Sequence, residues 1–404
     1  MAKILMIAHF TRGNLFGRFE YIADLLKKNG NDVELVTSKF DHVTKKHRNI
    51  RLISHELSTL KVTLLDEPGY FKNVSFIRVL SHVIFALNLR KFLKGKKDVD
   101  LVYCAFPPIC TAFVSLRYAK KRKIKLILDI QDLWPEAFYI LSKNKYFAEI
   151  LFSPLRLLED YIFRSAEGII AVSNTYLKRA IESRYKSENC KTVYLGVDLD
   201  YFDNLLKMNK NKLCKRGEYW LAYLGTLGEN YDITSVIDAI SLLNFNGINN
   251  IRLWLIGDGP KSDFFISYAK RKKIKVEFTG WLPYGQAITL LSLCDVAINP
   301  IKTGAANSII NKHADYSAAG LPVINTQECK EYVDMLNKFK AGINCRNGNT
   351  HEIASALLFF INNDVARKIY SLNSRKMCES LFDRKNTYNM IVTLVNKLLE
   401  PIKS

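Results

Sequence analysis

Three polar side chains on one predicted helix have the chemistry of a sugar-nucleotide site. Asn311, Lys312 and Asp315 follow a short apolar run at 296–298 that ends at Asn299. Lys312 offers a cation to a phosphate, and Asp315, three residues further along the helix, can accept hydrogen bonds from hydroxyls. A strand, a polar loop and a helix in this order place such groups at the carboxyl edge of a parallel sheet, where open α/β folds bind their ligands.

Glycines stand at three other predicted strand ends in the second half of the chain. The three groups are Gly225 and Thr226; Gly257, Asp258 and Gly259; and Gly280, Trp281 and Leu282. Glycine allows a ligand to approach the backbone closely. The spacing G-x-G-x-x-G fails at Ser262, and no G-x-x-x-x-G-K-[ST] loop is present. The sequence therefore indicates neither a dinucleotide fingerprint nor ATP hydrolysis.

The first half contributes candidates for an acceptor site. Asp132 follows Gln131 and a predicted strand, and it suits the base or orienter of an incoming hydroxyl. The alternative is an ordinary helix cap ahead of Pro135. His9 and Arg12 end the first predicted strand near the expected ligand edge, although a histidine satisfied within the fold is the alternative there.

Two Asp-x-Asp pairs, at 98–100 and 198–200, have the spacing of a metal site. Both flank predicted strands, which is typical of solvated turns. We therefore predict no metal.

Short β-branched runs that alternate with helical patterns must position these residues. The predicted strands are 3–10, 32–38, 49–53, 100–105, 124–130, 168–173 and 191–197 in the first half, and 219–225, 251–257, 275–281, 295–299, 321–326 and 341–345 in the second. Their continuous hydrophobicity indicates strands buried on both faces, as in parallel sheets covered by helices. The pattern predicts an α/β fold of two facing Rossmann-like domains with a cleft between them.

The chain length and a polar, basic stretch set the predicted domain boundaries. At 404 residues the chain is too long for one ordinary core. We predict an N-terminal acceptor-binding domain at 1–202, a linker at 203–217 and a C-terminal nucleotide-sugar-binding domain at 218–383. Residues 384–404 have helical apolar spacing, and we expect a final helix that crosses back to the first domain.

The net charge of +20 requires an anionic partner or a strongly basic surface. Nucleic acid, anionic lipid and a phosphorylated substrate would all fit, but no nucleic-acid-binding motif is present, so nucleic acid is not predicted. Residues 72–97 combine apolar helical spacing with basic and aromatic residues. They suit a helix at the membrane surface, or a long buried helix with a basic end.

The chain shows no signal peptide or membrane-spanning run, and its eight cysteines form no C-x-x-C pair. These features favour a cytoplasmic protein with reduced thiols, which could also lie at the inner face of the membrane.

Four motifs occur in a fixed order in the second half: YLGTLG at 223–228, GDGP at 257–260, FTGWLP at 278–283 and DYSAAGLPV at 315–323. With them, residues 219–345 resemble the family-4 glycosyltransferases of the GT-B fold. Gly17 falls where that family has its N-terminal glycine loop. The segments DIQDLWPEAF at 129–138 and NK-x-x-DY-x-AAG-x-P at 311–322 are similar to bacterial enzymes that build capsular or O-antigen repeat units.

The chain departs from the family pattern at four positions. Asn307 stands in place of the first glutamate, Gln131 in place of a histidine, and Thr226 and Tyr231 where an arginine and a lysine usually clamp the diphosphate. Lys312 is the substitute cation that we expect for them.

The resemblance also implies roles for residues of the donor site, and Gly17, Asn299 and Asn311 are predicted to bind the donor with them. Asn307 would hold the donor sugar and Asp315 the ribose, while the backbone of 280–282 would face the base.

The sequence and the resemblance together predict a retaining glycosyltransferase without a cofactor. The donor would be a nucleotide-diphosphate sugar, which we expect to be a UDP-sugar, and the group transferred would be hexosyl or N-acetylhexosaminyl. The acceptor would be a lipid-linked saccharide of capsule or O-antigen biosynthesis. The alternatives are a UDP-sugar 2-epimerase of the same fold and a non-catalytic protein that binds sugar nucleotides.

Overall fold

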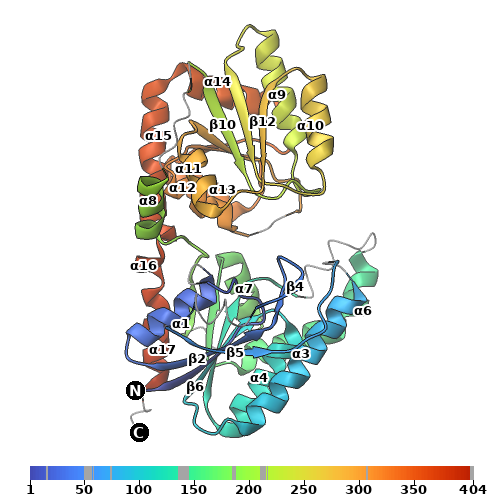
Figure 1. The fold of residues 1–404 in the computed structure, drawn as a ribbon, viewed down its shortest axis with the longest axis vertical. Helices are drawn as coiled ribbons and strands as arrows, with labels where there is room; N and C mark the ends of the chain where they lie inside the picture. The colour runs from blue at the N-terminus through green and yellow to red at the C-terminus, as the bar shows by residue number, and fades with distance from the viewer. Residues whose placement is uncertain are drawn as a thin grey trace. The chain divides into compact units, whose positions relative to one another are not determined.

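A computed structural model describes residues 1–14, 17–49, 57, 59–72, 75–134, 145–183, 188–209, 215, 217–305 and 308–400. The chain forms two compact units (Figure 1). Unit 1 comprises residues 1–193 and 388–404, and unit 2 comprises residues 194–387.

Unit 1 contains a seven-stranded parallel sheet. In spatial order its strands are β5 (Lys61–Leu65), β2 (Asp32–Ser38), β1 (Lys3–Ile7), β6 (Leu101–Phe106), β7 (Lys125–Ile130), β8 (Gly168–Ala171) and β9 (Cys190–Thr192). The connections run outward in opposite directions from β1 and β6, so the topological switch point lies between these two strands.

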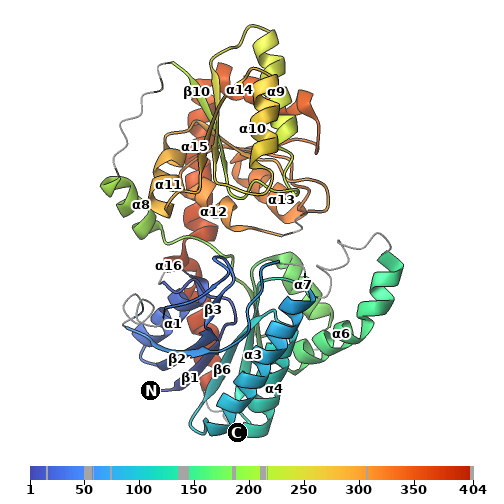
Figure 2. The ribbon, with the colours of Figure 1, turned by 45° about the vertical axis from the view of Figure 1, so that its right-hand side comes forward.

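Helices cover both faces of this sheet (Figure 2). Strand β1 shows why, because Ile4 and Met6 point to one core while Leu5 and Ile7 point to the other. The first core includes α1 (Arg18–Lys28) and α17 (Asn389–Leu399); the second includes α3 (Phe76–Gly95), α4 (Ile109–Arg122), α6 (Lys145–Ser165) and α7 (Asn174–Glu182). A short hairpin of β3 (Phe40–Asp41) and β4 (Lys46–His47) follows β2.

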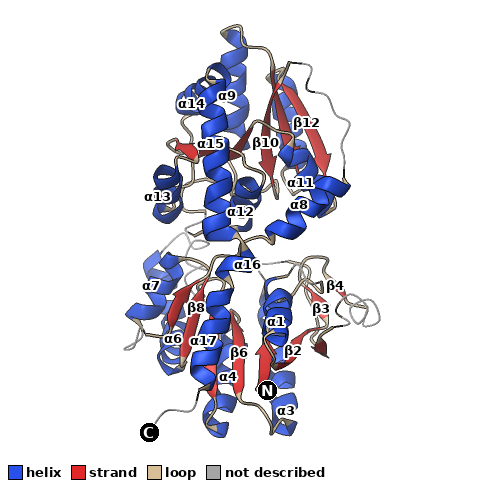
Figure 3. Ribbon diagram, turned by 90° about the vertical axis from the view of Figure 1, so that its left-hand side faces the viewer, coloured by secondary structure: helices blue, strands red, loops and turns tan. Residues whose placement is uncertain are grey.

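Unit 2 contains a six-stranded parallel sheet with the same layering (Figure 3). Its strand order is β12 (Lys275–Gly280), β11 (Ile251–Ile256), β10 (Tyr219–Leu224), β13 (Val296–Asn299), β14 (Val323–Asn325) and β15 (Gly342–Asn344). The switch point lies between β10 and β13.

Two groups of helices enclose the sheet of unit 2. One face is covered by α8 (Leu199–Met208), α11 (Tyr284–Ser292), α12 (Asn311–Ala318) and α13 (Lys330–Phe339). The other face carries α9 (Ile233–Phe245), α10 (Ser262–Arg271) and α14 (Thr350–Asn362). The chain then continues through α15 (Asp364–Met377), a π-helical turn η1 (Cys378–Phe382) and α16 (Arg384–Thr387).

The predicted α/β class with two parallel-sheet domains is confirmed. The domain boundary, however, lies at residue 193 instead of 202. The predicted linker at 203–217 begins inside α8, a helix of unit 2 whose Phe202 is fully buried. The polar residues at the start of that stretch form the exposed face of an amphipathic helix, and for this reason the stretch resembled a linker. The last helix, α17, packs in unit 1 against α1, β7 and β8.

The sequence analysis also missed β5, an edge strand whose residues are half-buried or exposed and therefore lack a continuous apolar run. The strand predicted at 49–53 falls, apart from residue 49, outside the described residues. No helix in the described part of the chain is long and apolar enough to cross a membrane.

Candidate functional site

Lys312 lies at the switch point of unit 2. It is the second residue of α12, it is only 7% exposed, and its ammonium lies 4.2 Å from the ring centroid of Tyr223 and 4.1 Å from that of Tyr231. Within the described residues the Nζ atom has no hydrogen-bond partner. Aromatic faces attract a cation, but they do not replace the hydrogen bonds that it loses when it leaves water. The arrangement is therefore suited to an anionic ligand.

Gly225 leaves room for this buried ammonium. It follows β10 with a φ of +131°, and a Cβ atom built on it would lie 3.1 Å from Lys312 Nζ. A side chain at position 225 would be strained and would crowd the cation. The neighbouring loop is fixed by the Tyr223 hydroxyl, which donates to the carbonyl of Thr226 at 2.6 Å, while the side chain of Thr226 is exposed.

Burial lowers the pKa of Lys312 to about 7, and the carboxylate of Asp315 opposes that shift. The lysine is therefore balanced between its two protonation states near neutral pH, and an incoming anion would favour the charged form. Asp315 is half-buried one turn along α12 and accepts a hydrogen bond from Tyr284 Oη at 2.7 Å.

The glycines at 257 and 259 serve backbone packing. A Cβ atom on Gly257 would lie 2.1 Å from the carbonyl oxygen of Gly225, and one on Gly259 would lie 2.4 Å from that of Leu227. These glycines therefore allow two loops to pack closely together, and the approach of a ligand to them stays a prediction. The exposed Asp258 accepts from the Ser262 hydroxyl at 2.7 Å and from the Gly259 amide at 2.7 Å.

Asn299 is fully buried and does not face a ligand, which corrects its prediction as a donor-binding residue. Its amide group donates to Asn325 Oδ1 at 2.8 Å and to Gln327 Oε1 at 3.1 Å. The network also holds α12 in place. His313 of that helix lies 3.3 Å from the same amide nitrogen and stacks on Tyr332.

The other donor-side candidates among the described residues lie at the end of β12 and at the start of α12. Asn311 is exposed and starts α12, whereas Asn307 lies outside the described residues. Gly280 ends β12 with a φ of +65°, and the next residue, Trp281, is 77% exposed. Leu282 packs against the core. A large exposed aromatic ring at the ligand edge of a sheet is available for stacking.

Asp132 and Gln131 follow β7 at the carboxyl edge of unit 1. Asp132 accepts hydrogen bonds from the Leu133 amide at 2.9 Å, Trp134 Nε1 at 3.3 Å and Tyr176 Oη at 3.3 Å. Burial raises its pKa, and these donors oppose the rise. The half-buried carboxylate is thus held in one place and is suited to contact a substrate hydroxyl.

Asp129 fixes Gln131 from inside unit 1. Gln131 Nε2 donates to this carboxylate at 2.5 Å, and Arg18 and Tyr103 donate to it at 3.0 and 2.6 Å. Asp129 itself is fully buried, so it orients its neighbours without reaching the surface.

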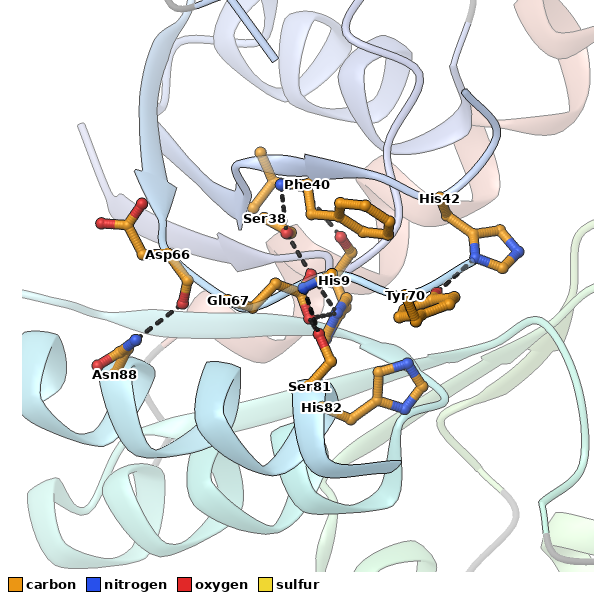
Figure 4. Close-up of polar contacts among 12 residues, drawn as sticks. His9, Ser38, Phe40, His42, Asp66, Glu67, Tyr70, Ser81, His82 and Asn88 are labelled. Atoms are coloured by element: carbon orange, nitrogen blue, oxygen red, sulfur yellow. Dashed lines mark hydrogen bonds and ion pairs between the residues drawn. The ribbon is translucent and has the colours of Figure 1, made fainter. Parts of the chain in front are cut away.

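His9 lies in a buried polar cluster (Figure 4), which corrects its prediction as an acceptor-side residue. Its Nε2 atom lies 2.9 Å from Glu67 Oε1, and the Ser81 hydroxyl donates to Glu67 Oε2 at 2.6 Å. Ser38 donates to the same carboxylate. With 1% exposure, His9 is a residue of the fold, which is the alternative that the sequence left open.

The remaining two predictions in unit 1 concern the loop after β1. Arg12 is exposed there. Gly17 caps the start of α1, and a Cβ atom on it would lie 2.0 Å from the carboxylate of the buried Glu20. The glycine is therefore required by Glu20, which accepts a hydrogen bond from the Gly13 amide at 2.7 Å.

The two Asp-x-Asp pairs have structural partners. Asp100 accepts from the Lys3 amide at 2.7 Å, Asp198 caps α8, and Asp200 pairs with Lys385 at 2.8 Å. In the part of the chain that the structure describes, no group of three histidine, cysteine or acidic residues is placed to hold a metal ion.

Sequence reasoning missed Tyr223 and Tyr231 as the residues that enclose the Lys312 ammonium. Tyr231 was visible only as a departure from a lysine position. The signal was present in the sequence. Tyr231 is an aromatic residue where the family has a lysine, and Lys312 on α12 is a lysine outside the family pattern.

Two family descriptions match successive parts of the chain. Residues 18–201 match "Glycosyltransferase Family 4", and residues 207–377 match "Glycosyl transferases group 1". An uncharacterized glycosyltransferase of Methanocaldococcus jannaschii is 21% identical over 89% of this chain and 88% of its own length.

Solved structures of low sequence identity share the fold. The Anabaena protein HepE in complex with UDP has a TM-score of 0.72 at 15% identity, covering 98% of this chain and all of its own. WaaG, a glycosyltransferase involved in lipopolysaccharide biosynthesis, has a TM-score of 0.63 at 12% identity, covering 98% of this chain and 99% of its own.

Proposed function

The chain belongs to the family-4 glycosyltransferases of the GT-B fold, and we propose that it transfers a sugar from a nucleotide-diphosphate sugar to a saccharide acceptor. The observation that carries the donor assignment is the buried ammonium of Lys312 at the switch point of unit 2, which has no hydrogen-bond partner in the part of the chain that the structure describes. A diphosphate would supply the hydrogen-bond acceptors and the negative charge that this cation lacks.

Each part of the donor has a proposed contact in unit 2. Lys312 would bind the diphosphate, Asp315 the ribose hydroxyls and Asn307 the sugar, while Trp281 would stack on the base. HepE was solved with UDP, and this supports uracil as the base here. We propose no cofactor beyond the donor itself.

In the proposed reaction the charge on the leaving diphosphate is offset by Lys312 and by the amide groups at the start of α12. Asp132 would orient the acceptor hydroxyl or accept its proton. The family resemblance favours retention of the anomeric configuration and a hexosyl or N-acetylhexosaminyl group. Asp132→Asn should lower kcat by about 10²–10⁴-fold while donor affinity is kept, which steady-state kinetics beside UDP titration would measure.

The outer face of α3 supports a lipid-linked acceptor and contact with the cytoplasmic membrane surface. Phe76 is 82% exposed, and further apolar side chains of this helix are exposed with it: Ile77, Val79, Leu80, Val83 and Leu87. Arg90, Lys91 and Lys94 follow on the same helix and are exposed. An apolar helix face beside cations suits an anionic lipid surface. Together with the likeness to WaaG, this favours a role in capsule or O-antigen biosynthesis.

A donor panel tests the proposed function directly. UDP-, GDP- and dTDP-sugars are incubated with the protein, and thermal stabilisation and donor hydrolysis are measured. We expect UDP-sugars to raise Tm and to be hydrolysed slowly. The absence of both effects with every donor would contradict the proposal, and release of a free epimer without acceptor would favour a 2-epimerase.

Membrane contact has its own test. Replacing Phe76 and Leu80 with serine should reduce co-flotation with anionic phosphatidylglycerol vesicles, because both side chains are exposed on α3. Phe245→Ser is the matched control, since that side chain is 90% exposed on unit 2. Unchanged flotation of the double variant would contradict the membrane role.

A further inference from the structure

A second group of cations in unit 1 lies among aromatic rings, and nothing above uses it. We call it the Arg78 cluster: Arg78, Lys45, Phe10, Tyr70, Trp134, His42 and His82. The guanidinium carbon of Arg78 lies 5.1 Å from the ring centroid of Trp134, 5.6 Å from that of Tyr70 and 5.8 Å from that of Phe10. These three rings come from three different segments, so the fold assembles the cluster around the arginine.

The charge in this cluster is mainly positive. Lys45 Nζ lies 4.7 Å from the centroid of Tyr70 and 3.3 Å from His42 Nδ1. Burial and then the neighbouring cations lower the pKa of His42 to about 4 and that of His82 to about 2, so both rings are neutral at pH 7. The cluster therefore holds its positive charge on Arg78 and Lys45.

The nearby acidic groups are engaged elsewhere. Glu67 receives hydrogen bonds from Ser38, Ser81 and His9, as Figure 4 shows. Asp41 accepts the amide of Val43 at 2.7 Å within its own turn.

The buried ring of His82 in the cluster has a nitrogen atom whose hydrogen bond is not made within the described residues. His82 is 3% exposed, and its Nε2 atom has no hydrogen-bond partner within the described residues. Its ring stacks on Trp134 at 5.6 Å between centroids. A ligand bound against Trp134 would supply the missing contact.

Trp134 joins the cluster to the proposed acceptor residue. Its Nε1 atom donates to Asp132 at 3.3 Å, while its ring contacts both Arg78 and His82. A molecule that presents a hydroxyl to Asp132 would therefore have the guanidinium and the aromatic rings within its reach. Arginine binds phosphate and carboxylate through its planar N–H edge, and aromatic faces suit the apolar faces of sugars.

We propose that the Arg78 cluster is an acceptor subsite for an anionic group, a phosphate or a carboxylate, carried by the saccharide acceptor. This inference rests on the proposed function, since it specifies the acceptor of that reaction. Arg78 is a specificity-determining residue in this account, while Asp132 contacts the reacting hydroxyl.

Fluorine NMR of the full chain labelled with 5-fluorotryptophan tests the subsite. The four tryptophans provide one reporter near Asp132 (Trp134), one on the donor loop (Trp281) and two within unit 2 (Trp220 and Trp254). Single Trp→Phe variants assign the signals. The probes are octyl phosphate, octyl glucuronide, neutral octyl glucoside and inorganic phosphate, each titrated separately.

We expect octyl phosphate or octyl glucuronide to shift the Trp134 signal, and octyl glucoside not to shift it. The response to the two anions distinguishes a phosphate from a carboxylate, and a response to inorganic phosphate shows that the anion suffices. Arg78→Met should weaken the binding about tenfold or more. Arg117→Met, an exposed arginine on α4, should have no effect.

Equal shifts with octyl glucoside, no shift with any anion, or full binding by Arg78→Met would overturn the proposal. Arg78→Lys keeps the charge but loses the planar edge, and we expect partial binding; it replaces the methionine variant if that one does not fold. A UDP titration followed at Trp281 tests the donor site separately. The failure of donor binding can thus be distinguished from the failure of the Arg78 cluster.

Discussion

Units 1 and 2 each bury a charged side chain at the carboxyl edge of a sheet. The protein supplies hydrogen bonds to the charged group in unit 1, but the described residues supply none to the one in unit 2. In unit 1, Glu67 is 5% exposed and receives hydrogen bonds from His9, Ser38 and Ser81. In unit 2, Lys312 is 7% exposed, and its ammonium contacts two aromatic rings without a hydrogen bond from the described residues. Equal burial therefore does not indicate equal roles.

The difference separates a structural charge from a ligand-binding charge. A buried ion whose hydrogen bonds are made within the protein stabilises the fold, and its removal leaves its partners unsatisfied. A buried ion that lacks such bonds costs stability and persists where a ligand supplies them. The same test assigns Glu67 to the fold and Lys312 to the donor site.

The largest effect is expected from Glu67→Ala. The substitution leaves His9, Ser38 and Ser81 without their shared acceptor in a buried site, so the free energy of unfolding should fall by about 3–5 kcal/mol. Urea unfolding followed by circular dichroism would measure it. Asp66→Ala is the matched control, because that carboxylate is 76% exposed in a surface pair with Lys39. If Glu67→Ala lowers the free energy of unfolding as little as the control does, Glu67 is not a structural charge and the contrast with Lys312 is contradicted.

The pH dependence of donor binding is the next effect in size. Because the pKa of Lys312 is about 7 in the folded chain, the charged form is lost as pH rises. UDP affinity should fall by up to about tenfold per pH unit between pH 7 and 9. Calorimetric titrations across this range would show it, and a pH-independent affinity would contradict the role of the ammonium.

The same lysine also affects the stability of the fold. Donor affinity should fall as pH rises, whereas the contribution of Lys312 to the free energy of unfolding should rise. Its folded pKa is lowered from the ordinary value of 10.5, so the unfolded chain binds more protons between about pH 7 and 10.5. The free energy of unfolding contributed by Lys312 therefore rises with pH over this window. Urea unfolding at pH 7 and 9 should show a smaller rise in Lys312→Met than in the unsubstituted protein, and equal rises would count against a buried, unpartnered ammonium.

The smallest effect is expected at Trp281. An exposed ring that stacks on a base contributes about 1 kcal/mol, so Trp281→Ala should weaken UDP binding about fivefold and leave inorganic diphosphate binding unchanged. Phe245→Ala, an equally exposed aromatic residue of unit 2, should change neither affinity. If UDP and diphosphate lose affinity equally, the ring does not contact the base.

Much of the fold was predictable because parallel strands buried on both faces produce continuous apolar runs. All six strands of unit 2 fall within the predicted runs. The edge strand β5 and the helix α8 were missed for the same physical reason, since each exposes part of its surface and its pattern is mixed with polar residues. A search for continuous apolar runs does not detect segments that are buried on one side only.

The candidate site was predictable in its residue types but not in its contacts. The position of Lys312 followed from the strand, loop and helix order, whereas its enclosure by Tyr223 and Tyr231 depends on side chains nearly 90 residues away in sequence. The glycines at 257 and 259 indicated ligand approach, but they pack against the backbone of Gly225 and Leu227. Such pairings arise only when two loops meet in space.

The measurement that tests the central claim most directly is UDP binding by Lys312→Met in isothermal titration calorimetry at pH 7, with Lys330→Met as the control. Lys330 has an 87% exposed side chain on α13. We predict that Lys312→Met loses about 1–3 kcal/mol of binding free energy while its free energy of unfolding is kept or increased, and that the control binds UDP normally. UDP affinity that is unchanged in the folded Lys312→Met variant would contradict the assignment of the donor site.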